Sequence, residues 1–360
     1  MSNVEVAAIT ITGQKHRHRG VPCEDASMAV NARGVSVVCV ADGAGSKQYT
    51  HARFGSACAV KTICDLLTEH FDALYNENRE AAVRALIIAQ LHVKFAELIE
   101  EHQLDSLERL SCTLMFCAIK GRRMMIGHIG DGMIARISPS GISPITMPQN
   151  GSNASSTYFV TASHASDYLR FIKTTVDDVH AIALMTDGVQ DSVYDENSGL
   201  VKPVVAKMAE TLRGGRKKAE TDLTKIVEKH IVGASNNSDD ASFGVLLIED
   251  TNGPDAGSLP VSADAFPSST DTFKDLQNAL IPSVKEAKRI ISEALARKSV
   301  TGEGEPETVK KGENEKAAAE TENKIPNVPV EAKKKNRILY GIVIVELILI
   351  FILVMKLLMT

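Results

Sequence analysis

The chain has 360 residues, of which 44% are hydrophobic, so it is long enough for one large domain or two small ones. Its formal net charge of -5 at pH 7 argues against a nucleic-acid-binding protein, because nucleic-acid-binding surfaces are strongly basic. The six cysteines form no Cys-x-x-Cys pair, so we expect free thiols in a reducing compartment. Residues 1–15 lack a basic start and an apolar core, and no secretory signal peptide is therefore expected.

Residues 1–250 are expected to form one domain in which helical and strand-like patterns are mixed. Period-two or continuous apolar runs predict strands at 4–12, 35–40, 111–119, 123–129, 133–137, 171–175, 181–185 and 241–248. Apolar residues at helical spacing predict helices at 51–70, 80–102, 201–212 and 221–230. Strands before and after a pair of long helices favour an α+β sandwich over a doubly wound parallel sheet.

The composition changes after residue 250. Residues 251–272 are rich in Pro, Ser, Gly and Asp, which predicts a flexible linker. Residues 273–299 carry apolar residues at helical spacing, a pattern that fits a docking helix and a solvated helical spacer equally well. Residues 300–337 are rich in Glu, Lys, Ala and Pro, which predicts a disordered stretch.

Residues 338–358 predict a transmembrane helix at the C-terminal end. The run is apolar except for Glu346 and Lys356, and its length suffices to cross a hydrocarbon core as a helix. A basic cluster at 333–337 precedes it, which places the N-terminal side in the cytoplasm. We therefore expect a single-pass tail anchor in the cytoplasmic or inner membrane, with the preceding domain facing the cytoplasm.

Short acidic motifs lie beside the expected strands. They are Glu24-Asp25-Ala26, Asp42-Gly43, Gly130-Asp131-Gly132, Asp187-Gly188 and Asp239-Asp240. Carboxylates at strand ends can meet in space, and ligand sets made only of oxygen suit Mg²⁺ and Mn²⁺. Each Asp-Gly pair alone is more often a simple turn, so the prediction depends on the order and spacing of the whole set.

The set resembles the PP2C-like (PPM) family of metal-dependent serine/threonine protein phosphatases over about residues 5–249. It is most similar to the bacterial-type branch through Gly13-Gln14-Lys15-His16 and Pro22-Cys23-Glu24-Asp25-Ala26. The resemblance implies a central β-sandwich flanked by α-helices. It also implies hydrolysis of phosphoserine and phosphothreonine on proteins, with two Mn²⁺ or Mg²⁺ ions and a looser third as cofactors.

The resemblance further implies roles for individual residues. Asp42 would bridge two ions, and Asp131 would help Asp187 to hold the third. Asp25 and Asp42 would thereby serve catalysis, because paired ions lower the pKa of a shared water and aim the hydroxide at phosphorus. The whole implied metal set is Glu24, Asp25, Asp42, Gly43, Asp131, Asp187 and Asp239.

A substrate phosphate also needs positive groups, and the basic stretch 16–19 lies just before the acidic pair. Better-known members of the family carry a single Arg at a fixed spacing that this sequence lacks. The choice among His16, His18 and Arg19 therefore stays open beside a solvated loop, with His16 and Arg19 as the catalytic candidates. Animal-type members have a His where this chain has Ala44, so the leaving group would be protonated by a metal-bound water or by one of these histidines.

The expected partners are phosphorylated proteins, including a serine/threonine kinase and its targets, and the membrane. Cys117 and Arg123 have the Cys-x5-Arg spacing of the thiol phosphatases, but Cys117 lies in an apolar run, where a free cysteine behaves as a small hydrophobic residue, so we do not expect that class. The leading hypothesis is an active enzyme. The alternatives are a catalytically weak or inactive phosphoprotein-binding regulator tethered to the membrane, and a tethered scaffold that acts through the helix at 273–299.

Overall fold

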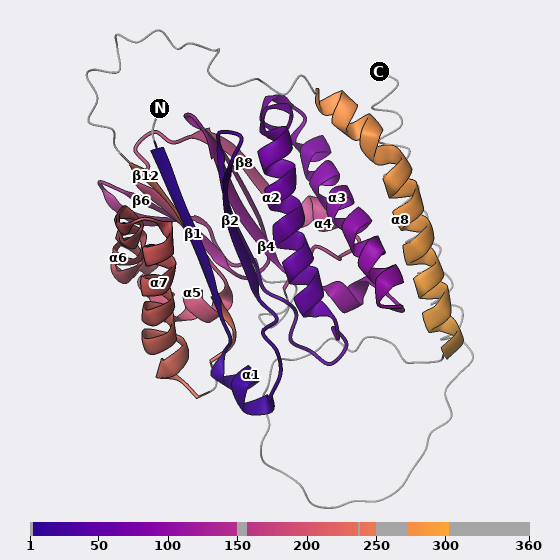
Figure 1. Ribbon diagram of the computed structural model, residues 1–360, viewed down its shortest axis with the longest axis horizontal. Coiled ribbons are helices and arrows are strands. Elements are labelled where there is room, and N and C mark those ends of the chain that lie inside the picture. Colours follow the sequence, from indigo (N-terminus) through magenta and orange to yellow (C-terminus); the bar gives the residue numbers. More distant parts are fainter. Residues whose placement is uncertain (1–2, 150–156, 237, 250–271, 302–360) are drawn as a thin grey trace, which may run out of the picture. The chain divides into compact units, whose positions relative to one another are not determined.

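The computed structural model of the protein describes residues 3–149, 157–236, 238–249 and 272–301. They all belong to the first of two compact units, Met1–Val309. Two five-stranded sheets pack face to face, and helices cover the outer face of each (Figure 1). This is the α+β sandwich flanked by helices that the sequence predicts.

All strand pairs in the two sheets are antiparallel. The first sheet has the order β1 (Asn3–Ile11), β12 (Ala241–Glu249), β9 (Ala181–Met185), β6 (Met133–Ser138) and β7 (Gly141–Thr146). The second has the order β2 (Ala26–Ala32), β3 (Val35–Ala41), β4 (Leu114–Lys120), β5 (Arg123–Ile129) and β8 (Arg170–Thr175). A separate hairpin pairs β10 (Tyr194–Asp195) with β11 (Leu200–Val201).

Strand β3 shows why its sequence is a nearly continuous apolar run. Successive side chains of a strand point to opposite faces of the sheet. Val38 and Val40 belong to the core between the two sheets, whereas Val37 and Cys39 belong to the core under the helices. Because both faces of β3 are buried, the strand has no polar face that would show as alternation in the sequence.

The helices form one outer layer on each sheet (Figure 1). Helices α2 (Ala52–Asn76) and α3 (Glu80–Glu101) share a core with the second sheet. Helices α5 (Asp187–Val193), α6 (Val204–Glu210) and α7 (Arg216–His230) share a core with the first. Short helices are α1 (Gln14–Arg19) and α4 (Ala165–Tyr168), with 3-10 turns at Leu107–Leu110, Thr211–Gly214 and Val232–Ala234.

Helix α8 (Phe273–Thr301) lies alongside α3 (Figure 1). Arg289 approaches Glu100 of α3 to 3.7 Å, and Arg297 donates a hydrogen bond of 3.3 Å to Gln103 just beyond α3. The segment is thus a docked helix and not a solvated spacer. Its buried side chains join the core under the second sheet, and they are Phe273, Ala287, Ile290 and Ala294.

The sequence pattern did not predict α1, β2 or β7. For each of these elements the structure shows a physical reason why the pattern missed it. Strand β7 lies at a sheet edge and contains Pro144, which an edge strand tolerates. Strand β2 is rich in small residues that are only partly buried. Helix α1 is held from outside, because Ser238 accepts hydrogen bonds from the N–H groups of Gln14 and Lys15.

Among the described residues, no helix is long and apolar enough to cross a membrane. The expected anchor at 338–358 lies outside this part of the chain, so it stays a prediction. The linker expected at 251–272 and the disordered stretch expected at 300–337 lie almost wholly outside it as well.

Candidate active site

The acidic motifs lie at strand ends that antiparallel pairing brings together. Asp25 directly precedes β2 and Asp42 directly follows β3, and the register places Ala26 opposite Ala41. Asp187 begins α5 just after β9, which pairs with both β6 and β12. Residues far apart in the sequence therefore meet at one end of the sandwich.

Four carboxylates form what we call the inner acidic group, namely Asp25, Asp42, Asp131 and Asp187. Burial raises the pKa of Asp42 well above its usual range, and the negative charges of Asp187, Asp25 and Asp131 raise it further. Burial likewise raises the pKa of Asp25. A hydrogen bond with Asp42 offsets part of that rise, and the charges of Asp240 and Asp187 add to it. Like charges are thus gathered around Asp25 and Asp42.

Asp25 is held in this group by a buried hydroxyl. Thr186 donates a hydrogen bond of 2.9 Å from Oγ1 to Oδ2 of Asp25, and it accepts one of 2.8 Å from the N–H of Ser242. Oδ1 of Asp25 is buried and, among the described residues, faces no amide, amine or hydroxyl donor. Within the described part of the chain, one carboxylate oxygen of Asp25 is therefore available to an added ligand.

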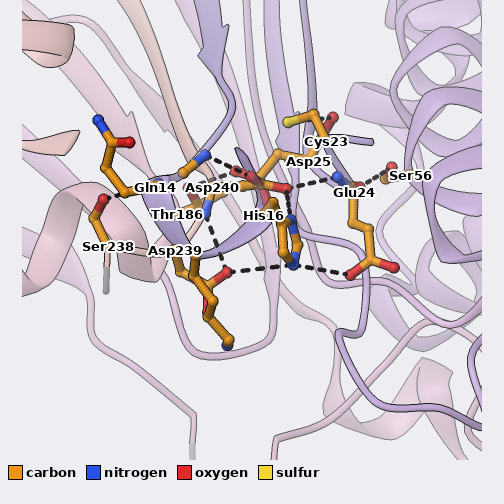
Figure 2. Close-up of polar contacts among 12 residues, drawn as sticks. Gln14, His16, Cys23, Glu24, Asp25, Ser56, Thr186, Ser238, Asp239 and Asp240 are labelled. Carbon is orange, nitrogen blue, oxygen red and sulfur yellow. Dashed lines mark hydrogen bonds and ion pairs between the residues drawn. The ribbon is translucent and has the colours of Figure 1, made fainter. Parts of the chain in front are cut away.

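A second cluster, which we call the rim, consists of Lys15, His16, Glu24, Asp239 and Asp240. Figure 2 shows His16 with its three carboxylate neighbours. Asp240 is buried and accepts three hydrogen bonds, from the N–H of Gly13 at 2.7 Å, the N–H of Glu24 at 2.6 Å and Nδ1 of His16 at 2.8 Å. Nε2 of His16 then lies 3.7 Å from Oε2 of Glu24 and 4.0 Å from Oδ1 of Asp239. Asp240 therefore holds both helix α1 and the turn that carries Glu24 and Asp25.

Of the three carboxylates at the rim, Glu24 and Asp239 have opposite pKa shifts. Burial raises the pKa of Glu24 to about 7, although His16 opposes the rise. Burial also acts to raise the pKa of Asp239, but Lys15, whose Nζ lies 3.1 Å from Oδ2, outweighs it and holds the pKa below its usual range. Asp239 is thus already paired within the chain.

Gly43 lies where no other residue fits. A Cβ atom at this position would lie 2.4 Å from the carbonyl oxygen of Glu24, so the turn after Asp42 can approach the acidic pair only with glycine. The carbonyl of Glu24 also accepts a hydrogen bond of 2.5 Å from Ser56 of α2. The turns at Glu24-Asp25 and Asp42-Gly43 are therefore packed directly on each other.

The family model described as protein phosphatase 2C matches residues 12–228 of the chain. The chain belongs to the protein phosphatase 2C family. This confirms the resemblance that the acidic motifs carry. No curated protein matches the chain.

Similar solved structures include three bacterial proteins. PppA, a key regulatory component of T6SS in Pseudomonas aeruginosa, is 16% identical, with 69% of this chain and 99% of that chain covered and a TM-score of 0.49. The catalytic domain of the phosphatase PstP, solved with two manganese ions, is 15% identical, with 69% and 100% covered and a TM-score of 0.47. The phosphatase Stp1 from Staphylococcus aureus is 18% identical, with 69% and 96% covered and a TM-score of 0.46.

The inner acidic group fits divalent cations by its chemistry. Its donors are all carboxylate oxygens, which Mg²⁺ and Mn²⁺ prefer, and a cation would remove the repulsion that raises the pKa values of Asp25 and Asp42. Among the described residues, however, no three Asp, Glu, His or Cys side chains already converge as a formed metal site. Carboxylates that repel one another are expected to stand apart until a cation draws them in.

The residues of the basic stretch 16–19 differ in burial and in their partners. His16 is buried in the rim, whereas His18 and Arg19 are exposed, and Arg17 pairs with Glu228 of α7 at 3.1 Å. Of the two catalytic candidates in this stretch, the structure therefore brings His16 into the site and leaves Arg19 on the surface.

Three residues of the site were missed from the sequence. Asp240 is the hydrogen-bond centre of the rim, Lys15 pairs with Asp239, and Thr186 holds Asp25. Asp240 had a signal in the Asp239-Asp240 dipeptide, where only the first residue was given a role. No signal in the sequence indicated the roles of Lys15 and Thr186, because their partners lie far away along the chain.

Proposed function

We propose that the protein hydrolyses phosphoserine and phosphothreonine on proteins with the help of two divalent ions and a looser third. The observation that carries this proposal is the inner acidic group, in which burial and mutual repulsion raise the pKa values of Asp25 and Asp42. Such a group is unfavourable by itself and becomes favourable when cations bind. The four carboxylates come from separate turns, as expected for a site that was assembled to hold ions.

Asp25, Asp42, Asp131 and Asp187 would hold Mn²⁺ or Mg²⁺, with Glu24, Asp239 and the Gly43 carbonyl completing the set. When bound, the ions supply an acidified water as nucleophile and neutralise charge on the phosphoryl group. The chain itself positions these oxygens through Thr186 and through the packing of the two acidic turns. In-line attack then needs no covalent intermediate with a side chain.

His16 is the group that we assign to the substrate phosphate. Asp240 holds its Nδ1, so its Nε2 faces the space beside Glu24 and Asp239. In the protonated form, Nε2 donates a hydrogen bond to a phosphoryl oxygen or a proton to the departing serine or threonine oxygen. The carboxylate behind the imidazole fixes its orientation for this task.

The proposed activity is tested with a chromogenic phosphate ester and with peptides that carry phosphoserine, phosphothreonine or phosphotyrosine. We expect Mn²⁺-dependent release of phosphate from the first two peptides and its loss in Asp42→Ala and Asp187→Ala. Asp222→Ala on the outer helix α7 is the matched control and keeps full activity. A wild type that binds Mn²⁺ fully and releases no phosphate from any substrate would contradict the proposal.

A regulator that binds phosphoproteins without hydrolysing them is the second candidate. The observation in its favour is that Arg17 pairs with Glu228 of α7 and Arg19 is exposed, so neither is held at the rim as His16 and Lys15 are. The same assay separates the two functions. A wild type that binds a phosphopeptide in the presence of Mn²⁺ without turnover would favour the regulator.

We also propose that residues 338–358 anchor the protein in the cytoplasmic membrane, with the phosphatase domain in the cytoplasm. The apolar run and the basic cluster at 333–337 support this topology. The substrates would then be phosphoproteins near the membrane, including a serine/threonine kinase and its targets. Fractionation of the full chain against a chain that ends at residue 337 tests the anchor, and a full chain found in the soluble fraction would contradict it.

A further inference from the structure

Thr113 directly precedes β4, the strand between β3 and β5, and it is only 1% exposed. The register of β3 with β4 pairs Val40 with Met115 and continues to a bridge between Gly43 and Cys112. Asp42 therefore stands directly opposite Thr113.

The hydrogen bonds between Thr113 and Asp42 depart from a regular ladder. Directly opposite residues of an antiparallel hydrogen-bonded pair exchange two bonds between N–H and C=O groups. The N–H of Thr113 does donate to the carbonyl of Asp42 at 2.8 Å. The return bond, however, runs from the N–H of Asp42 to the side-chain Oγ1 of Thr113, at 2.9 Å. A side chain has thus taken the place of a backbone acceptor at the turn that carries Asp42.

The other side of Thr113 faces the turn that carries Asp131. The register of β4 with β5 pairs Leu114 with Ile129, which continues to Thr113 and Gly130. A Cβ atom on Gly130 would lie 2.5 Å from both Cβ and Cγ2 of Thr113, and the φ of Gly130 is +124°. The methyl side of Thr113 therefore packs against the backbone immediately before Asp131.

We propose that Thr113 is a positioning residue that sets the Asp42 turn and the Asp131 turn relative to each other, its hydroxyl holding the first and its methyl group the second. The inference rests on the proposed metal-dependent function, in which Asp42 holds the two tight ions and Asp131 the looser third. Thr113 itself is not one of the predicted ion ligands. Its two substituents act on different parts of the site, so they can be removed separately.

Two variants test the hydroxyl and the methyl group of Thr113 separately. Thr113→Val keeps the branched shape and leaves the N–H of Asp42 without its acceptor, and a buried group without a partner is costly. We expect this variant to raise the Kd of the tight Mn²⁺ ions by about tenfold, comparable to the loss of an outer-shell partner. Thr113→Ser keeps the hydroxyl and removes the methyl group. We expect it to leave the tight ions unchanged and to raise the Kd of the weakest Mn²⁺ ion by a few-fold.

The test is calorimetric titration of the full chain with Mn²⁺ alone, together with the Tm of each variant in EDTA. Thr62→Val removes a buried hydroxyl from α2 and is the matched control, with unchanged Mn²⁺ binding. A Thr113→Val protein that binds Mn²⁺ as the wild type does, or variants that both weaken the same ion equally, would overturn the inference. If Thr113→Val does not fold, a Thr113→Ser protein with wild-type affinity for every ion would overturn it as well.

Turnover of the chromogenic ester adds a readout that simple destabilisation would not move. With Mn²⁺ saturating for the wild type, Thr113→Val should lower kcat and leave KM nearly unchanged, and excess Mn²⁺ should restore kcat. Failure of the proposed function has a different signature, namely a wild type that binds Mn²⁺ and has no turnover while the order of Mn²⁺ affinities among the variants still holds.

Discussion

The inner acidic group and the rim are both built from carboxylates, but their charges are balanced differently. Asp42 has carboxylates as its charged neighbours, and its pKa is raised. Asp239 has the ammonium group of Lys15 at 3.1 Å, and its pKa is lowered. A cation of the chain thus offsets the charge of Asp239 at the rim, whereas neighbouring carboxylates add to the charge around Asp42. The difference teaches that the inner group costs stability which only a bound cation returns.

The largest expected effect comes from removing one inner charge. Asp42→Asn should lower Mn²⁺-dependent phosphatase activity by at least about 100-fold, the upper range for losing even an outer-shell metal partner. The same change should raise the Tm in EDTA, because a neutral amide replaces a carboxylate whose charged form is disfavoured. Activity is measured with the chromogenic ester and the Tm by scanning calorimetry.

Asp239→Asn is the matched comparison for this prediction. It also removes a predicted metal ligand, but it breaks the pair with Lys15, so its Tm in EDTA should not rise. The contrast between the two groups is wrong if both variants change the Tm in EDTA in the same direction and by the same amount.

The second largest expected effect is the change of Tm with pH when no metal is bound. The pKa of Glu24 is raised from 4.5 to about 7, so the folded state binds a proton more tightly than the unfolded state. Its contribution is fully present below pH 4.5 and is lost as the pH rises to about 7. The raised pKa values of Asp25 and Asp42 likewise lower the stability of the fold as the pH rises. The Tm in EDTA should therefore fall across this window.

Asp239 acts in the opposite direction, because its lowered pKa stabilises the fold above its ordinary value of 3.8 and the contribution is lost on acidification. Glu24→Gln should flatten the decline of Tm between pH 4.5 and about 7. Saturating Mn²⁺ should abolish it, because ligated carboxylates bind no proton. A decline of the same slope in wild type and Glu24→Gln would count against the raised pKa of Glu24.

The smallest expected effect comes from breaking the ion pair between Lys15 and Asp239 at the rim. The side chains of Lys15 and Asp239 are 33% and 36% exposed, so the pair is expected to contribute only about 0.2–1 kcal/mol. Lys15→Met should lower the Tm by no more than about 2–4 °C. It should also strengthen Mn²⁺ binding slightly at low salt, since it removes a competing positive charge.

Lys61→Met on α2 breaks a more exposed pair with Asp65 and serves as the control for Mn²⁺ binding. Calorimetric titration at two salt concentrations measures the difference. Weaker Mn²⁺ binding in Lys15→Met would mean that the pair organises Asp239 as a ligand and does not compete with the ion.

Much of the sandwich was predictable because each strand carries its own pattern. Strand β3 is apolar throughout because both faces are buried, and the helices α2 and α3 repeat apolar residues with helical spacing. Helix α1 was not predictable, because the groups that hold its first turn belong to the loop around Ser238. Local pattern reports burial, whereas a short helix held from outside depends on a partner that local pattern does not contain.

The sequence by itself determined the fold class and the set of acidic positions, since periodicity and motif order are properties of the linear chain. Only the tertiary structure decided that His16 enters the site while Arg19 does not, and that α8 docks on α3. The bond from Gly13 to Asp240 joins residues 227 positions apart. Contacts at such separation depend on how the two sheets close, and that closure is where carboxylates from distant turns become one site.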